Sequence, residues 1–326
     1  MKAVIHEMGK LKVGQIEDPV AKQGEVIVSI KVAGLNRRDL YIPRRRGNQA
    51  EALILGSDGA GIVESVGEGV TTFAVGDEVI INPALRWEKN SVAPPAAFDI
   101  LGMPDHGTFA EKIAISEDQL ERKPAHFSWE QAAVVALAGL TGYRALFTKG
   151  ELKAGQTVFI PGAGSGVASF LVQFAKKCGA RVIVTSRDEQ KRQQALALGA
   201  DLALDTNADW EAALKEETID LVIESVGKAT FNRSLATLKK GGRIVVFGAT
   251  TEDVVELDLR NFFYGQYQLF GSTMGSKEEL QEMLAFMEQY QITPVIDKAY
   301  TLDDAPEAFD YLETNQQFGK VLFNIQ

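Results

Sequence analysis

A glycine-rich turn between an apolar segment and a helical pattern has the residue types and spacing to bind an anion. Residues 157–160 are apolar or β-branched and lead into Pro161 and five small residues. From Val167 to Cys178, apolar residues recur at the i, i+3, i+4, i+7 spacing of one buried helix face. This order of strand, turn and helix predicts a pyrophosphate on the helix N-terminus, because free backbone N–H groups and the helix dipole favour an anion. The residues predicted to surround it are Gly162, Ala163, Gly164, Ser165, Gly166 and Val167.

The turn departs from the G-x-G-x-x-G pattern, because Ser169 stands where a third glycine is expected. A better register runs from Ala163 to Ala168, with Ala168 as the small residue that lets the helix approach the strand. The alternative is a tight strand-to-helix turn that binds no ligand. The order of the strands and helices that follow favours a dinucleotide site.

The end of the second strand predicts which dinucleotide binds. NAD sites usually place Asp or Glu about twenty residues beyond the glycines, where it holds the ribose 2′-hydroxyl. Here the strand ends in Ser186 and Arg187, and Lys191 lies one helical turn further on. Hydroxyl and cationic groups favour a 2′-phosphate, so these three residues are predicted to select NADPH over NADH. Two alternatives stay open: Asp188 could occupy the ribose site, and Ser186 could be a helix N-cap in a capping box with Glu189.

The pattern of predicted strands and helices changes along the sequence, which predicts two domains. Up to residue 122, short β-like segments alternate with glycine turns, which is typical of a compact β-barrel-like domain. From residue 123, strands alternate with helices, which predicts an α/β domain with a doubly wound parallel sheet. The tail is β-like again and is predicted to rejoin the first domain. The predicted domains are therefore 1–122 with 294–326, and 123–293.

The second domain is expected to contain six strands, at 157–160, 181–185, 202–204, 220–224, 243–247 and 267–271. Helices are expected at 165–178, 189–198, 209–216, 229–238 and 277–290. Such sheets bind ligands beyond the carboxyl ends of their strands. This predicts further cofactor contacts from Ser225, Val226, Phe247, Gly248, Ala249 and Thr250. The last strand is expected at the sheet edge, and because exposed edges invite pairing, it predicts a homodimer.

Composition argues against several classes of protein and partner. The 326 residues are 45% apolar and 24% charged, which is ordinary for a soluble globular protein. A net charge of −10 makes nucleic acid and anionic membranes poor partners. The single cysteine permits no internal disulfide, and the N-terminus has no apolar segment of signal-peptide length, so a cytoplasmic location is predicted. No run reaches the roughly 18 apolar residues of a membrane span.

Five short motifs are spread over nearly the whole chain: AGLNRRD at 33–39, LGSDGAG at 55–61, GTFAE at 107–111, AGLTGYRAL at 138–146 and VFGAT at 246–250. With the dinucleotide turn, they resemble the medium-chain dehydrogenase/reductase superfamily, specifically its zinc-lacking quinone-oxidoreductase-like and enoyl-reductase-like branch. The resemblance implies a GroES-like catalytic domain, a Rossmann domain and an active site in the cleft between them.

The zinc-ligand positions are where this sequence departs from zinc-dependent members of that superfamily. Those members have Cys at the position of Asn36, a His-Glu pair at Ser57-Asp58, and a third ligand, usually Cys, near Leu137. Asn36, Ser57 and Leu137 cannot supply the three-ligand set that a catalytic zinc needs. The three histidines are scattered without ligand spacing. We therefore predict no metal, and a zinc-dependent alcohol dehydrogenase is disfavoured.

Asn36 and Tyr41 are the residues predicted to act in catalysis. Asn36 is similar to the family asparagine near the nicotinamide ribose and is expected to orient cofactor or substrate; its alternative role is an Asx turn. Tyr41 could donate a proton or could simply pack, and Thr141 is expected near the nicotinamide amide or the phosphates. The arginines at 37, 38 and 44–46 are typical of a solvated loop, but could also steer a polyanionic cofactor or an acidic substrate.

The resemblance implies zinc-independent, NADPH-dependent reduction of quinones or of the C=C bond in α,β-unsaturated carbonyls. Such acceptors delocalise charge onto an oxygen, so enclosure and a few hydrogen-bond donors can replace a Lewis acid. The alternative is a non-catalytic NADPH-binding or redox-sensing protein on the same fold, because the fold by itself does not define the chemistry.

Overall fold

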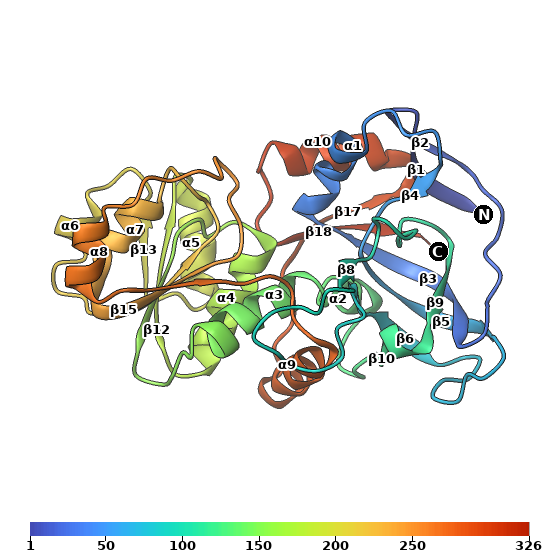
Figure 1. Cartoon of the computed structure of the whole chain (residues 1–326), viewed down its shortest axis with the longest axis horizontal. Coiled ribbons are helices and arrows are strands. Elements are labelled where there is room, and N and C mark those ends of the chain that lie inside the picture. Colours follow the sequence, from blue (N-terminus) through green and yellow to red (C-terminus); the bar gives the residue numbers. More distant parts are fainter. Residues whose placement is uncertain (326) are drawn as a thin grey trace. The chain divides into compact units, whose positions relative to one another are not determined.

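The computed structural model describes residues 1–325, and contacts between residues divide them into two units (Figure 1). The first unit contains Met1–Leu140 and the chain from Gly275 onward, and the second contains Thr141–Met274. The alternation of strands and helices in the sequence predicted that 123–140 and 275–293 belong to the α/β domain. Their contacts group them with the first unit instead. Two helices explain the difference: α2 (Trp129–Ala132) packs on β3 and β5 of the first unit, and the first residue of α9 (Lys277–Tyr290) donates its backbone N–H to Trp87 O.

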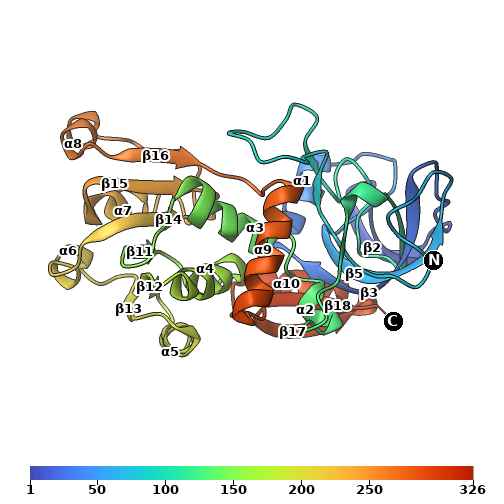
Figure 2. The same cartoon turned by 90° about the horizontal axis from the view of Figure 1, so that it is seen from below.

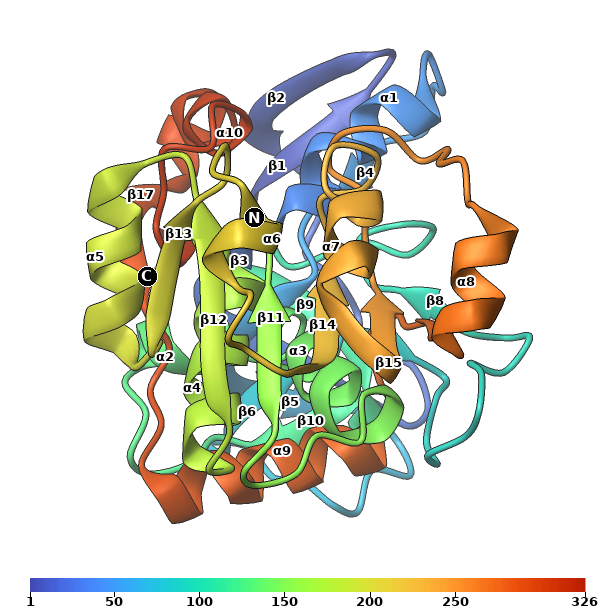
Figure 3. The ribbon, with the colours of Figure 1, turned by 90° about the vertical axis from the view of Figure 1, so that its left-hand side faces the viewer.

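The second unit is built on one parallel six-stranded sheet of order β13-β12-β11-β14-β15-β16, of which Figure 3 shows β13 to β15 side by side. Near-continuous apolar runs form its central strands, as expected for strands covered on both faces. The predicted α/β class and doubly wound parallel sheet are confirmed. Its strands are β11 (Thr157–Ile160), β12 (Arg181–Ser186), β13 (Leu202–Asp205), β14 (Ile219–Glu224), β15 (Leu238–Val246) and β16 (Gln268–Gly271).

Helices alternate with these strands, and α5 packs against β12 and β13 while α7 packs against β14 and β15. The largest difference from the predicted helices is in α6, which covers four residues instead of 209–216, because Glu217 N bonds back to Leu214 O and turns the chain toward β14. The helices are α3 (Ala138–Tyr143), a π-helical segment (Arg144–Lys149), α4 (Gly166–Lys177), α5 (Glu189–Leu198), α6 (Trp210–Ala213), α7 (Phe231–Thr237) and α8 (Leu259–Gly265).

The first unit is mostly β-structure, centred on the long strand β3 (Glu25–Leu35). This strand pairs with β5, β9 and β18 in a seven-stranded sheet. The C-terminal strand β18 (Lys320–Asn324) lies between β3 and β17, so the predicted return of the tail to the first unit is present. The other strands are β1 (Lys2–Glu7), β2 (Lys10–Gln15), β4 (Leu53–Ile54), β5 (Asp58–Val66), β6 (Glu78–Ile81), β7 (Ala84–Leu85), β8 (Asp99–Ile100), β9 (Lys112–Ser116), β10 (Leu120–Arg122) and β17 (Ile296–Thr301).

Short helical segments connect these strands. A 3₁₀ turn, η1 (Arg37–Leu40), follows β3 directly and leads into α1 (Ile42–Arg46). Helix α10 (Ala305–Glu313) lies beside β17 (Figure 2). Two more 3₁₀ turns are η2 (Glu117–Gln119) and η4 (Leu302–Asp304). Among the described residues, no helix combines the length and apolarity needed to span a membrane.

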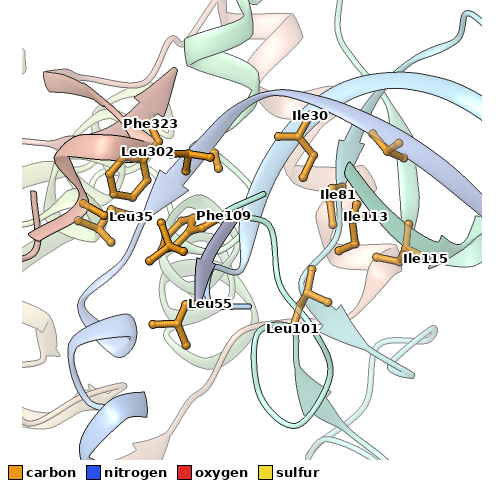
Figure 4. Close-up of a cluster of buried hydrophobic side chains, with 14 of the residues drawn as sticks. Ile30, Leu35, Leu55, Ile81, Leu101, Phe109, Ile113, Ile115, Leu302 and Phe323 are labelled. Atoms are coloured by element: carbon orange, nitrogen blue, oxygen red, sulfur yellow. The ribbon is translucent and has the colours of Figure 1, made fainter. Parts of the chain in front are cut away.

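A buried apolar cluster holds the first unit together (Figure 4). Phe109 is fully buried in it, and its ring meets Phe323 of β18 edge-to-face with centroids 4.9 Å apart. Leu35, at the end of β3, and Leu55 lie in the same cluster. Because the residues that follow these two leucines carry the polar motifs at 36–39 and 57–58, this apolar packing fixes the position of those motifs.

Candidate functional site

Most predicted cofactor residues of the second unit lie beyond the carboxyl ends of its parallel strands. They follow the carboxyl ends of β11, β12, β14 and β15, which are parallel and therefore end on the same side. The loops after β14 and β15 are tied together, since Thr250 N donates to Ser225 O at 3.1 Å. Thr141, also predicted, is buried in this unit within 3.9 Å of the Met274 sulfur.

The glycine turn needs its glycines for two different reasons. Gly162 has φ +85°, a conformation that L-residues with side chains adopt at a cost. The Lys191 side chain lies close to Gly164. A Cβ at Gly164 would be 2.7 Å from Lys191 Cδ and 3.1 Å from its ammonium nitrogen. The Lys191 side chain therefore lies against the turn, which places its charge beside the predicted pyrophosphate site.

Only part of the turn is free to bind an anion. The N–H groups of Gly162 and Ala163 both donate to Thr185 O, at 3.1 and 2.8 Å, so they join the turn to β12. Ser165 is the N-cap of α4 and accepts the N–H of Ala168 at 3.1 Å. Among the described residues, the N–H groups of 164–167 have no acceptor. A group of free amides at a helix N-terminus fits a pyrophosphate. The free amides are those of 164–167, whereas the predicted set also contained Gly162 and Ala163.

The end of β12 shows which residue caps α5. The N-cap of α5 is Asp188, whose carboxylate accepts the N–H of Lys191 at 3.2 Å. The capping box between Ser186 and Glu189 is therefore wrong, since β12 continues through Ser186 and the helix begins later. Asp188 is also exposed, and its capping bond gives it a structural role. Arg187 is exposed at the strand end, while Ser186 is buried and accepts the N–H of Asp188 at 3.2 Å.

Two charged residues that sequence reasoning missed hold this edge in shape. Arg192 donates to Ser186 O at 2.7 Å and braces the end of β12. Glu224 ends β14, is fully buried, and accepts from Thr230 Oγ1 at 2.9 Å and Ser234 Oγ at 2.8 Å. Glu224 could have been found in the sequence as the acidic residue that ends an otherwise mostly apolar predicted strand.

A second cluster of polar residues lies within the first unit, where β3, β5 and β18 bring distant parts of the sequence together. Asn36 Nδ2 donates to Asp58 Oδ2 at 2.9 Å, and Asn36 Oδ1 accepts from the Lys320 ammonium group. Lys320 also bonds to Leu35 O at 3.1 Å and pairs with Asp58 at 3.4 Å. We call Asn36, Asp39, Asp58 and Lys320 the Asn36 cluster; all four are buried.

The third zinc-ligand position is joined to this cluster. Asp58 Oδ1 accepts the backbone N–H of Leu137 at 2.7 Å, and Thr108 Oγ1 donates to Asp58 O at 2.7 Å. Asn36 and Leu137 are thus linked through one carboxylate. Since both ends of the Asn36 amide are engaged by Asp58 and Lys320, its predicted role toward cofactor or substrate remains a prediction.

Burial shifts the pKa of two residues of the Asn36 cluster, Asp39 and Lys320. Burial raises the pKa of Asp39 to about 6, against the opposing effect of the nearby Arg38 guanidinium. Asp39 Oδ2 accepts the N–H of Asn36 at 2.8 Å, while Oδ1 has no partner among the described residues. Burial also lowers the pKa of Lys320, and the carboxylates of Asp58 and Asp39 oppose that effect. Sequence reasoning missed Lys320, which lies at the far end of the chain.

Arg38 lies against the second zinc-ligand position. Its Nη1 donates to Ser57 Oγ and, at 2.7 Å, to Leu101 O, and Ser57 Oγ itself donates to Leu101 O at 2.8 Å. A longer bond of 3.5 Å runs from Nη2 to Ile100 O. Ser57 is fully buried, whereas Arg38 is half-buried. The Arg38 side chain therefore extends from a partly exposed position to the buried Ser57 hydroxyl group.

The other arginines of this segment point to different places, so they form no single basic surface. Arg46 is buried and donates to His6 O at 2.9 Å, whereas Arg44 is exposed and pairs with Glu313 at 2.6 Å. Tyr41 caps η1, donates its N–H to Arg38 O at 3.0 Å, and is half-buried, so its predicted proton-donor role stays a prediction.

Comparison with known proteins agrees with this architecture. The zinc-binding dehydrogenase family matches residues 166–289, and the alcohol dehydrogenase GroES-like domain family matches residues 22–125. A zinc-type alcohol dehydrogenase-like protein of Schizosaccharomyces pombe is 32% identical over 100% of this chain and 99% of its own length. The chain belongs to the medium-chain dehydrogenase/reductase superfamily. The first unit is its GroES-like part and the second its Rossmann part, as predicted.

Superfamily members of different activities are similar to this chain. An acryloyl-coenzyme A reductase of Sulfurisphaera tokodaii is 30% identical over 99% of both chains. A crystal structure of an NAD-dependent alcohol dehydrogenase is 33% identical, covers 100% of both chains and has a TM-score of 0.93. Membership of the superfamily therefore leaves the reaction to be argued from the site itself.

The donor set does not fit the zinc that the name of the matching family implies. Asn36 and Ser57 offer an amide and a hydroxyl that are already engaged, and Leu137 offers no side-chain donor. Among the described residues, no three His, Cys, Asp or Glu side chains are grouped to hold a metal ion. Catalytic zinc requires three N, S or O ligands and an open position, which these residues do not provide.

Proposed function

We propose that this protein is a zinc-independent, NADPH-dependent oxidoreductase that reduces the C=C bond of α,β-unsaturated carbonyl compounds, or quinones, by hydride transfer. The observation that carries the proposal is that two of the superfamily's zinc-ligand positions hold side chains already engaged by other residues, Asn36 by Asp58 and Ser57 by Arg38, while the glycine turn keeps free amides. The similarity to an acryloyl-coenzyme A reductase supports an enoyl substrate.

NADPH, when bound, supplies the hydride, and the residues of the second unit bind and orient it. The free N–H groups of 164–167 would hold the pyrophosphate. Ser186 and Arg187 would hold the 2′-phosphate, because a hydroxyl and a cation stand where NAD sites carry an acid. Lys191, predicted with them, lies against the glycine turn, where its charge would favour the pyrophosphate. The nicotinamide half would be lined by Thr141, Ser225, Val226, Phe247, Gly248, Ala249 and Thr250.

A conjugated acceptor suits a site without a Lewis acid. Hydride addition to an enoyl or quinone carbon moves charge onto an oxygen, where a few oriented N–H donors stabilise it. An unconjugated carbonyl or alcohol usually requires a metal ion for the same step. This difference favours conjugated acceptors over the alcohols that the zinc-type relatives suggest.

The test of cofactor choice is binding of NADPH and NADH to Arg187→Ala. We expect a loss of about 1–3 kcal/mol toward NADPH, the scale of a charge-assisted hydrogen bond, and little change toward NADH. Arg181→Ala is the matched control, since Arg181 is an exposed arginine at the other end of β12, paired with Glu217. Equal losses for both dinucleotides in Arg187→Ala would contradict the assignment.

The test of the reaction is NADPH oxidation by crotonyl-CoA, 2-cyclohexen-1-one and a quinone, with and without a chelator. We expect turnover that the chelator leaves unchanged. Turnover with quinones alone would restrict the proposal to quinone reduction. Binding of NADPH without any turnover would favour the non-catalytic alternative, and chelator-sensitive alcohol oxidation would favour a zinc enzyme.

The edge strand supports a proposed homodimer. Strand β16 is the last strand of the sheet, as predicted, and Leu269 within it is 45% exposed. Helix α8, just before it, exposes Leu259, Phe263 and Tyr264. Unpaired edges and exposed apolar side chains favour association with a second copy. A strictly monomeric protein at micromolar concentration would contradict the dimer.

A further inference from the structure

We propose that the Arg38 guanidinium group takes over the work of the missing metal by binding the carbonyl oxygen of the substrate. The inference rests on the proposed function and identifies the group that would polarise the acceptor. Three observations on the first unit carry it: the place of Arg38, its free donors and its lack of an ion pair.

The place of Arg38 is set by the polypeptide around it. It is the second residue of η1, two residues after Asn36, and its Nη1 donates to Ser57 Oγ. Asn36 and Ser57 stand where zinc-dependent members have two metal ligands. The positive charge of this side chain is therefore held against the position that a zinc ligand occupies elsewhere in the superfamily.

The guanidinium group has hydrogen-bond donors to spare. It carries five N–H groups in a planar fork, and only three bonds to described residues use them, one of these as long as 3.5 Å. The two short bonds both leave from Nη1 and fix the plane of the group. A fixed fork with unused N–H groups suits an oxygen that gains charge.

No carboxylate of the described residues lies within ion-pair distance of the Arg38 guanidinium group, although the charges of Asp39 and Asp58 act on it from further away. Asp58 pairs with Lys320 at 3.4 Å, and Asp39 accepts from the backbone of Asn36. Arg38 itself forms no ion pair with a described residue, although it is half-buried. A partly desolvated cation without a direct carboxylate contact is stabilised further by a ligand that brings negative charge.

These features define the chemical step. A hydride that bound NADPH would give up from its C–H bond, leaving NADP⁺, bonds to the β-carbon of the enoyl group. The former C=C electron pair moves to join the α-carbon to the carbonyl carbon, and the carbonyl pair moves onto oxygen. Arg38 would donate N–H hydrogen bonds to that enolate oxygen. A proton from solvent then adds to the α-carbon, and the carbonyl forms again, so electrons and atoms balance.

The experiment compares Arg38→Gln, Arg38→Lys and Arg44→Gln in the full chain. Arg44 is the matched control, because it lies in the same basic segment but is exposed and paired with Glu313. We expect Arg38→Gln to lower kcat/KM for crotonyl-CoA by about 100-fold, the effect of losing an oxyanion donor, mainly through kcat. Arg38→Lys should recover part of this loss, and Arg44→Gln should stay within about twofold of the parent.

Two further measurements separate a direct role from a structural one. The NADPH dissociation constant should be unchanged in Arg38→Gln, and the variant should stay folded at the assay temperature, with a thermal midpoint lowered only by the lost bonds to Ser57 and Leu101. Activity of Arg38→Ala should be restored in part by guanidinium chloride, and not by sodium chloride at equal ionic strength. Equal losses in Arg38→Gln and Arg44→Gln would indicate general electrostatic steering and would overturn the proposal, as would failure of both rescue and the lysine variant.

A binding measurement keeps this inference distinct from the proposed function. Butyrate presents a carboxylate in place of the enolate oxygen and needs no turnover. If the protein does not turn over any acceptor, yet Arg38→Gln weakens butyrate binding about tenfold or more, the reductase proposal fails and the Arg38 site stands. If butyrate binding does not depend on Arg38 and activity does not either, the Arg38 site is wrong.

Discussion

The glycine turn of the second unit and the Asn36 cluster of the first unit use their polar groups in opposite ways. Both lie just beyond strand ends and both belong to motifs of the superfamily. In the turn, the N–H groups of 164–167 have no acceptor among the described residues. In the cluster, Asn36, Asp58 and Lys320 are buried and satisfy one another.

This difference follows from how much each kind of polar group costs when it has no partner. Free amides at a helix N-terminus cost little in water and are completed by an anion when it binds. Buried charges cannot wait for a ligand, because an unpaired ion in a dry interior costs several kcal/mol. In this chain the buried Asn36 side chain is engaged by the Asp58–Lys320 ion pair, whereas the N–H groups of 164–167 stay open among the described residues.

Breaking the closed cluster should have the largest effect. Lys320→Met removes the buried ammonium group and leaves Asp58 without its cation, so we expect a loss of about 3–5 kcal/mol in the free energy of unfolding. Lys298→Met removes an exposed lysine paired with Glu307 and should cost no more than about 1 kcal/mol. Denaturant titrations compare the two variants, and equal losses would show that the cluster is not closed as described.

The partner of the same ion pair sharpens this result. Adding Asp58→Asn to Lys320→Met removes the uncompensated charge, so the double variant should be more stable than Lys320→Met. If the second substitution lowers the free energy of unfolding further by its full single-variant cost, the two residues are not coupled.

The pH dependence of stability should report the burial of Asp39. Its pKa is raised from 3.8 to about 6, so the folded protein binds more protons than the unfolded chain between these values, and stability falls as pH rises through them. Relative to Asp39→Asn, the parent should gain up to about 3 kcal/mol as pH is lowered from 7 to 4. Unfolding at several pH values measures this difference, and a gain in the opposite direction would contradict the burial of an ionised Asp39.

The smallest effect is expected at the open turn. Gly162→Ala forces a side chain into φ +85° and should cost about 1–2 kcal/mol in the free energy of unfolding. Gly155→Ala is the matched control, because Gly155 has φ +82° and open space around its Cβ. Both should lose similar stability, but only Gly162→Ala, whose Cβ would lie 3.3 Å from Val226, should weaken NADPH binding. Unchanged NADPH affinity in both variants would separate Gly162 from the site.

Local periodicity was sufficient to predict most elements of the second unit. The bounds of β11, α5 and α9 agree with those expected, and the other five strands of the sheet differ by a few residues at their ends. Their apolar positions repeat with the period of the structure they form, so each segment carries its own signal. The N-cap of α5 was misplaced by sequence reasoning, since Ser186 and Asp188 are both good caps and only the length of β12 decides between them.

Long-range bonds could not be predicted in this way. Lys320 meets Asn36 because β18 pairs with β3, and nothing near either residue signals that pairing. The same is true of the bond between Leu137 and Asp58. Each bond depends on where sheets bring strand ends, which is a property of the whole domain.

The sequence by itself determined the superfamily, the strand–turn–helix at 157–177 and the loss of zinc-ligand residue types at Asn36, Ser57 and Leu137, because residue type and local spacing are enough for these. Only the tertiary structure decided which residues meet the side chains at these positions. A buried lysine from the last strand pairs with Asp58, and an arginine bonds to Ser57, because folding must satisfy every buried charge and polar group with whatever the topology brings near.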